Sequence, residues 1–172
     1  QKNTAIGYEA LLTEDTGDFN TAVGYQALAT QNKDGTVSNT AVGYQAGYDV
    51  STGYDNTLLG ASSAVNLTTG EQNVIVGNNA GSTATSQANM VLIGHNAGDA
   101  INDDAADGTV AIGKDALTDL TSGAGNTAVG YLASNDVTTG DGNTSLGYRA
   151  LATSAGSSAA SSFIASPALC PI

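Results

Sequence analysis

Basic residues, tryptophan, cysteine and long apolar runs are scarce or absent in this chain. Four Lys and Arg stand against sixteen Asp and Glu, which gives a formal net charge of −12. Nucleic-acid binding depends on a basic surface, so this charge argues against a nucleic-acid partner and against an anionic membrane. No apolar run approaches the ~20 residues that a membrane-spanning helix needs. We therefore expect no nucleic acid and no membrane insertion, and an acidic surface that repels its neighbours.

The shortage of cysteine and large aromatic residues limits what the interior can be. Cys170 is the only cysteine, which excludes an internal disulfide framework and leaves either a bridge between chains or a free thiol. Tryptophan is absent and there are only two Phe, so the interior must be narrow and filled by Ala, Val, Leu and Ile. Because the first residue is Gln1 and not Met, we expect a processed or excised product.

What the chain does have is a repeated motif, Asn-Thr-Ala-Val-Gly-Tyr-Gln-Ala at residues 39–46. The glycine at its centre, the repeat glycine, recurs at spacings of 17 or 19 residues in nine copies: Gly7, Gly24, Gly43, Gly60, Gly77, Gly94, Gly113, Gly130 and Gly147. A fixed period of this kind is the signature of a stacked repeat architecture. We predict a repeat array over residues 1–151, with residues 152–172 as an Ala/Ser-rich cap or linker tail.

Each repeat predicts one coil of a parallel β-solenoid. The Thr-Ala-Val-Gly-Tyr segment is β-branched, aromatic and bounded by turn residues, which indicates a strand. A second, weaker strand is expected at segments such as Ala27-Leu28. Turns are expected at Thr-Gly pairs such as Thr52-Gly53, where glycine would supply a positive φ. Repeated glycine and β-branched residues disfavour a helix. The fold class is therefore all-β, a β-roll of nine coils and, at ~4.8 Å per coil, about 40 Å long.

Asparagine precedes the strand in most coils. Asn89 stands one position early and Thr109 replaces the missing residue, so the series reads Asn3, Asn20, Asn39, Asn56, Asn73, Asn89, Asn126 and Asn143. In stacked parallel strands, side-chain amides hydrogen-bond along the stacking axis. We predict this structural ladder in preference to a binding role.

The strands are apolar on both faces. In the fifth coil Val74 and Val76 oppose Ile75 and Gly77, and such continuous runs are typical of strands buried on both sides. A coil of 17 residues can cover one face with its own chain and has little left for the other. We therefore predict that another copy of the chain covers the second face. The alternative is a single flattened solenoid with its small residues inside.

The motif with its Thr-Gly turn resembles the head repeats of trimeric autotransporter adhesins and the β-roll repeats of phage tail fibres and related bacterial surface proteins. The resemblance covers roughly residues 1–151. It implies three chains that pack left-handed parallel β-rolls into a stalk or head, often followed by an endosialidase-type chaperone. The chain departs from the family pattern in its longer units and at Ala61, Asn78, His95 and Lys114, which replace the Tyr of the motif.

Signals for catalysis and metal binding are weak. His95 is the only histidine, and no Ser, Asp or Cys stands out as its partner, so we predict no enzyme, no catalytic residue and no cofactor. The densest acidic cluster lies in residues 99–107, namely Asp99, Asp103, Asp104 and Asp107. Oxygen ligands suit Ca²⁺, but the spacing matches no calcium loop. A solvated loop is the prediction, and bound calcium is the alternative.

Three functions remain open from the sequence. The first is the shaft or head of a homotrimeric extracellular fibre, on a virion or cell surface, that attaches to a receptor or glycan. The second is a filament subunit whose open strand edges stack end to end. The third is a ligand- or ice-binding solenoid. Its threonine row is interrupted at Val74, Val91 and Val110 and comprises Thr4, Thr21, Thr40, Thr57, Thr127 and Thr144.

Overall fold

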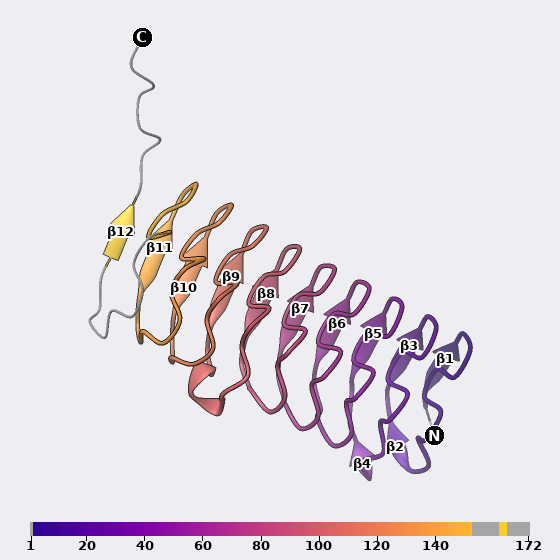
Figure 1. Ribbon diagram of the computed structural model, residues 1–172. Helices are drawn as coiled ribbons and strands as arrows, with labels where there is room; N and C mark the ends of the chain where they lie inside the picture. The colour runs from indigo at the N-terminus through magenta and orange to yellow at the C-terminus, as the bar shows by residue number, and fades with distance from the viewer. Residues whose placement is uncertain (1, 153–161, 165–172) are drawn as a thin grey trace.

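The chain folds into an elongated stack of coils, as Figure 1 shows. The structure, a computed structural model, describes residues 2–152 and the backbone of residues 162–164. One parallel sheet runs the length of the stack, and its strands lie in the order β1 (Thr4–Ile6), β3 (Thr21–Val23), β5 (Thr40–Val42), β6 (Thr57–Leu59), β7 (Val74–Val76), β8 (Val91–Ile93), β9 (Val110–Ile112), β10 (Thr127–Val129), β11 (Thr144–Leu146) and β12 (Ser162–Ile164). The predicted all-β parallel solenoid is confirmed.

The two longer repeats place their extra residues in loops away from this sheet. In the first loop, β4 (Gly35–Thr36) pairs in parallel with β2 (Gly17–Asp18) to form a small second sheet. The second loop contains the 3₁₀ helix η1 (Asp104–Ala106). Polar surface loops tolerate such insertions, so the main sheet keeps its register across both.

The strands stack with equivalent residues opposite one another. Thr40 pairs with Thr57, and Thr57 pairs with Val74. Backbone β12 continues this sheet beyond β11, with Thr144 opposite Ser162. Of the predicted tail, residues 153–161 and 165–172 lie outside the described residues, and Cys170 is among them.

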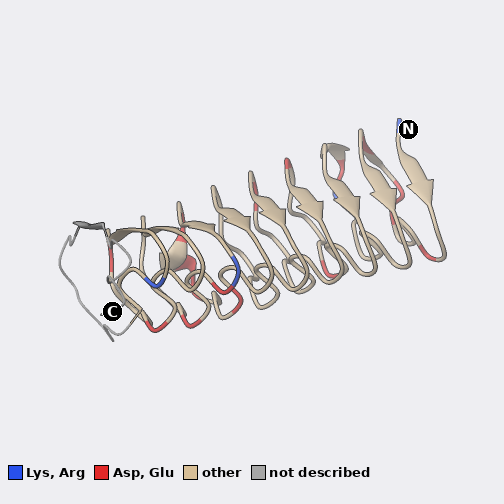
Figure 2. Cartoon of the chain, turned by 90° about the horizontal axis from the view of Figure 1, so that it is seen from above, with Lys and Arg blue, Asp and Glu red and all other residues tan. Residues whose placement is uncertain are grey.

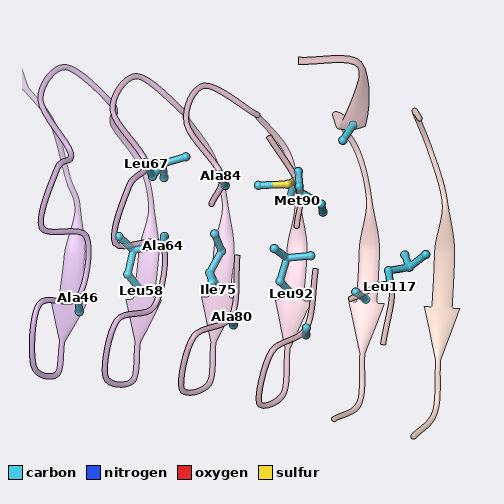
Figure 3. Packing of buried hydrophobic residues seen from close by; sticks show 14 of the residues in the cluster. Ala46, Leu58, Ala64, Leu67, Ile75, Ala80, Ala84, Met90, Leu92 and Leu117 are labelled. Carbon is cyan, nitrogen blue, oxygen red and sulfur yellow. The ribbon is translucent and has the colours of Figure 1, made fainter. Parts of the chain in front are cut away.

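The middle residue of each strand points into the coil. From the second coil to the ninth these residues are fully buried: Ala22, Ala41, Leu58, Ile75, Leu92, Ala111, Ala128 and Ser145. Figure 3 shows Leu58, Ile75 and Leu92 on the same side of their strands, turned toward the interior. The first and third strand residues point the other way, as the alternation of a strand requires. The predicted alternation of strand residues between two faces is therefore confirmed, and burial of the outer face by a second copy stays a prediction.

The sixth and seventh coils fill the same interior space with a large side chain from different positions. Leu92 is large, and a Cβ at Gly98 would lie 2.9 Å from its Cδ2. In the next coil the order is reversed, because Ala111 is small and the buried Leu117 occupies the position equivalent to Gly98. A narrow interior can accept one large aliphatic side chain at either position, which keeps the packing dense.

The predicted second strand at Ala27-Leu28 is wrong, because this segment forms part of a six-residue turn. Gln26 has a φ of 54° and Leu28 a φ of 49°, and left-handed residues recur at the same two positions of every coil. This conformation is unfavourable for most L-residues. The turn is held by the adjacent coil: the Leu28 N–H donates to the Ala46 carbonyl at 3.1 Å.

Glycine is required where adjacent coils touch through their backbones. Gly60 has a φ of 131°, and a Cβ there would lie 2.5 Å from the Gly77 oxygen. The predicted reason for the Thr-Gly glycines is wrong at Gly53 and Gly70, which do not have a positive φ. They are needed because a Cβ would collide with the next coil, at Gly70 only 2.5 Å from the Gln87 oxygen.

The predicted asparagine ladder is confirmed with one correction. The Asn56 side-chain amide donates to the Gly70 carbonyl at 2.9 Å, and its Oδ1 accepts from the Asn73 N–H at 3.1 Å. Asn89 does not belong to the ladder. It is exposed with a φ of 59°, and the buried Met90 takes the ladder position.

Candidate interaction surface

The first and third residues of the nine repeat strands form one flat outer surface, which we call the strand face. Its first row is Thr4, Thr21, Thr40, Thr57, Val74, Val91, Val110, Thr127 and Thr144. Its second row is Ile6, Val23, Val42, Leu59, Val76, Ile93, Ile112, Val129 and Leu146. Neither row contains an ionisable residue. The predicted threonine row is present, with its predicted interruption at the three valines.

The strand face leaves aliphatic side chains in contact with solvent in the isolated chain. Ile6 is 60% exposed, Leu146 49% and Val74 38%. In Figure 2 the strands of the long sheet carry no acidic or basic colour, and the acidic colour lies in the segments that connect these strands. A contiguous apolar surface bordered by polar residues is characteristic of an interaction site.

Exposed tyrosines border the strand face, two positions after the second row. Tyr8, Tyr25 and Tyr44 stack with 5.3 Å between successive ring centroids, and their planes lie within 14° of parallel. Tyr131 and Tyr148 form a second stack with the same separation. We call these two stacks the tyrosine rows. Because each ring rests on the next, their side chains are held in place before any partner arrives.

Small or polar residues interrupt the tyrosine rows in the middle of the solenoid. Ala61, Asn78, His95 and Lys114 occupy the intervening positions. The Lys114 ammonium donates to Asp115 and lies 5.6 Å from the centroid of the Tyr131 ring. The Nδ1 of His95 lies 3.8 Å from Asp115 Oδ1. His95 is therefore an exposed residue of the repeat, with a carboxylate from the next coil beside it.

Two opposing effects act on the pKa of the Asp115 carboxyl. Burial raises the pKa of its carboxyl, but hydrogen bonds from Lys114 and Asn96 and the nearby positive charge outweigh this effect and leave the pKa lowered. The hydrogen bond to Asp115 raises the pKa of Lys114. At neutral pH both groups are therefore charged, and the pair is neutral as a unit.

A second line of polar contacts, which the sequence did not reveal, runs beside the tyrosine rows. Gln26 Nε2 donates to Glu9 at 2.6 Å, and Gln45 Nε2 donates to Gln26 Oε1 at 2.8 Å. The recurrence of Gln after Tyr was the available signal. These amides lie on left-handed residues and join successive coils at the border of the surface.

The acidic loop does not gather its carboxylates. Asp103 accepts from the Ala105 N–H at 3.0 Å and Asp107 accepts from the Ala88 N–H at 2.8 Å. Asp99 accepts from Ser82, and Asp104 accepts from Ser86. Within residues 2–152, no three His, Cys, Asp or Glu side chains group as a metal site would require. Calcium at residues 99–107 stays an untested alternative.

Comparison of the chain with protein-family models, with curated proteins and with solved structures finds no match. In the part of the chain that the structure describes, no helix has the length and apolar character to cross a membrane. The arguments that follow therefore depend on the geometry and chemistry of the strand face and its borders.

Proposed function

We propose that this solenoid is a structural and adhesive module of an extracellular fibre, in which copies of the chain pack against one another through their strand faces. The single observation that carries the proposal is the strand face itself. It carries only aliphatic and threonine side chains, and no charge, along nine coils of a chain whose net charge is −12. Acidic copies can approach closely only where both contribute uncharged surface.

The size of the strand face is consistent with a substantial gain from self-association. Nine strands spaced ~4.8 Å apart, each three residues long at ~3.3 Å per residue, give a face of about 400 Å². Burying that area would contribute about 10 kcal/mol at ~25 cal/mol/Å², before the costs of association are subtracted. A homotrimer is the assembly that the resemblance to β-roll fibres implies. The attachment target, a receptor or glycan on a surface, belongs to the same proposal.

Sedimentation equilibrium and native mass measurement test the self-association. We expect the wild-type chain to be trimeric at micromolar concentration. Val91→Lys places a charge in the first row of the strand face and should weaken assembly at least about 100-fold, because the charge would be buried without a partner. Thr139→Lys adds the same charge in an exposed turn and should have little effect. A monomeric wild-type chain would refute the proposal.

A further inference from the structure

We infer that the tyrosine rows are part of the self-association surface, where they pack against a second copy of this chain. This inference rests on the proposed function and extends the contact surface beyond the strand face. It is carried by the area of the strand face, by the placement of the rings and by the distribution of charge.

The strand face alone is smaller than a typical specific interface between two copies. Specific interfaces bury ~800 Å² on each partner, roughly twice the ~400 Å² that nine three-residue strands provide. The missing area must come from residues next to the face. The tyrosines are the large apolar side chains in that place, and their exposure ranges from 42% at Tyr131 to 64% at Tyr8.

The rings are arranged as interface residues are. They stack with interplanar angles between 7° and 14°, so little side-chain freedom remains to be lost on binding. Tyrosine is enriched at protein interfaces because it offers a broad apolar ring and a hydroxyl that can stay hydrated at the rim. A ridge of such rings along the border of one copy can cover the aliphatic second row of another.

Charge also permits this contact. Ten of the sixteen acidic residues lie outside the six-residue turns that carry the row positions. Of the other six, Glu9 and Asp115 directly follow a row position, and Asp49, Asp99, Asp119 and Asp136 come four or five positions after one. Glu9 accepts from Gln26, and Asp115 is neutralised by Lys114. The row positions themselves carry no acidic side chain, so two copies carrying −12 each can approach along them with less repulsion than at the acidic loops. A second copy of the chain fits this border better than a basic partner would.

The experiment compares three variants of the full chain by sedimentation equilibrium. Tyr8→Ser/Tyr25→Ser/Tyr44→Ser removes one tyrosine row and should raise the dissociation constant of the assembly at least about tenfold. The corresponding triple Phe variant keeps the ring area and should assemble within about threefold of wild type. Tyr54→Ser is the control, since Tyr54 lies in the segment before β6 and belongs to neither row.

Each outcome decides between the two proposals. If the wild-type chain assembles and the triple Ser variant assembles as tightly as the wild type, the tyrosine rows lie outside the interface and the inference is wrong. If the wild-type chain is monomeric at every concentration, the proposed function fails first. Thermal unfolding of each variant, followed by circular dichroism, shows whether the coils are intact. If the triple Ser variant does not fold, protection of the row tyrosines from nitration in the wild-type assembly, relative to Tyr54, decides instead.

Discussion

The central coils, four to seven, and the outer coils reach the same backbone through different side chains. The outer coils carry Tyr beside the strand face, Asn in the ladder and mostly Ala at the middle of the strand. The central coils replace the Tyr with small or polar residues, and coils six and seven replace the Asn with Met90 and Thr109. At the middle of the strand, Leu58, Ile75 and Leu92 take the position that Ala holds in the outer coils, and they fill the interior. Coils four and five keep Asn56 and Asn73 in the ladder beside these large side chains, so aliphatic packing there adds to the ladder and takes its place only at Met90.

What both regions share is the contact between repeat glycines, so its loss should have the largest effect. Gly60→Ala needs an unfavourable φ of 131° and places a Cβ 2.5 Å from the Gly77 oxygen. We expect a loss of more than about 4 kcal/mol, enough to prevent folding. Gly35→Ala is the control: Gly35 also has a positive φ, of 85°, but no atom lies within 4 Å of its Cβ, so the difference between the two variants reports the collision between coils. Urea unfolding of the two variants measures the difference, and equal stabilities would contradict it.

The aliphatic interior of the central coils should rank second. Leu92→Ala leaves a cavity in a fully buried site, and we expect a loss of about 4 kcal/mol in the free energy of unfolding. Leu92→Ala/Gly98→Leu transplants the arrangement of Ala111 and Leu117 into this coil. We expect the double variant to recover more than half of the loss in urea unfolding. A double variant no more stable than Leu92→Ala would show that the two positions do not exchange volume.

The asparagine ladder should rank third. Asn56→Ala leaves the Gly70 carbonyl and the Asn73 N–H without their side-chain partners, at a cost of about 2 kcal/mol. Thr109→Ala is the comparison at the interrupted part of the ladder, where the Thr109 hydroxyl donates to the Ala106 carbonyl at 2.7 Å. We expect about half the loss there. A Thr109 variant as unstable as the Asn56 variant, by thermal unfolding, would remove the distinction between continuous and interrupted ladder.

The Asp115 pair should give the smallest effect. Because the folded-state pKa of Asp115 is lowered, its contribution is present above the unfolded pKa and is lost as the pH falls through the folded value, below about pH 4. Asp115→Asn should therefore flatten the acid side of the plot of Tm against pH by about 2 °C at most, since exposed ion pairs contribute little. An unchanged acid slope would show that the pair does not stabilise the fold.

The sequence predicted those parts of the fold that are marked by the same residue type in each coil. The repeat glycines located nine coils, and the apolar runs located the strands and their two faces. The left-handed turn was missed because Gln26 and Leu28 are not residues that favour a positive φ; the neighbouring coil holds them there. Asn89 was misplaced for a related reason, since asparagine suits both the ladder and the left-handed position before it.

The candidate surface was predictable only in part. The alternation within each strand indicated which residues face outward, and the motif located the tyrosines. The stacking of the rings and the contacts of Lys114 with Asp115 and Tyr131 depend on the distance between coils, for which a single sequence has no local signal.

Because equivalent residues of successive coils lie opposite one another, each coil adds one strand spacing to the length of the stack. Since Thr57 lies opposite Val74, removing residues 57–73 would bring Thr40 directly opposite Val74 without disturbing the strands on either side. The rod can thus grow or shorten by gain or loss of one 17-residue segment, in steps of one strand spacing. A gene encoding such a chain can change the reach of its product by simple duplication, while every remaining coil keeps the neighbours it needs.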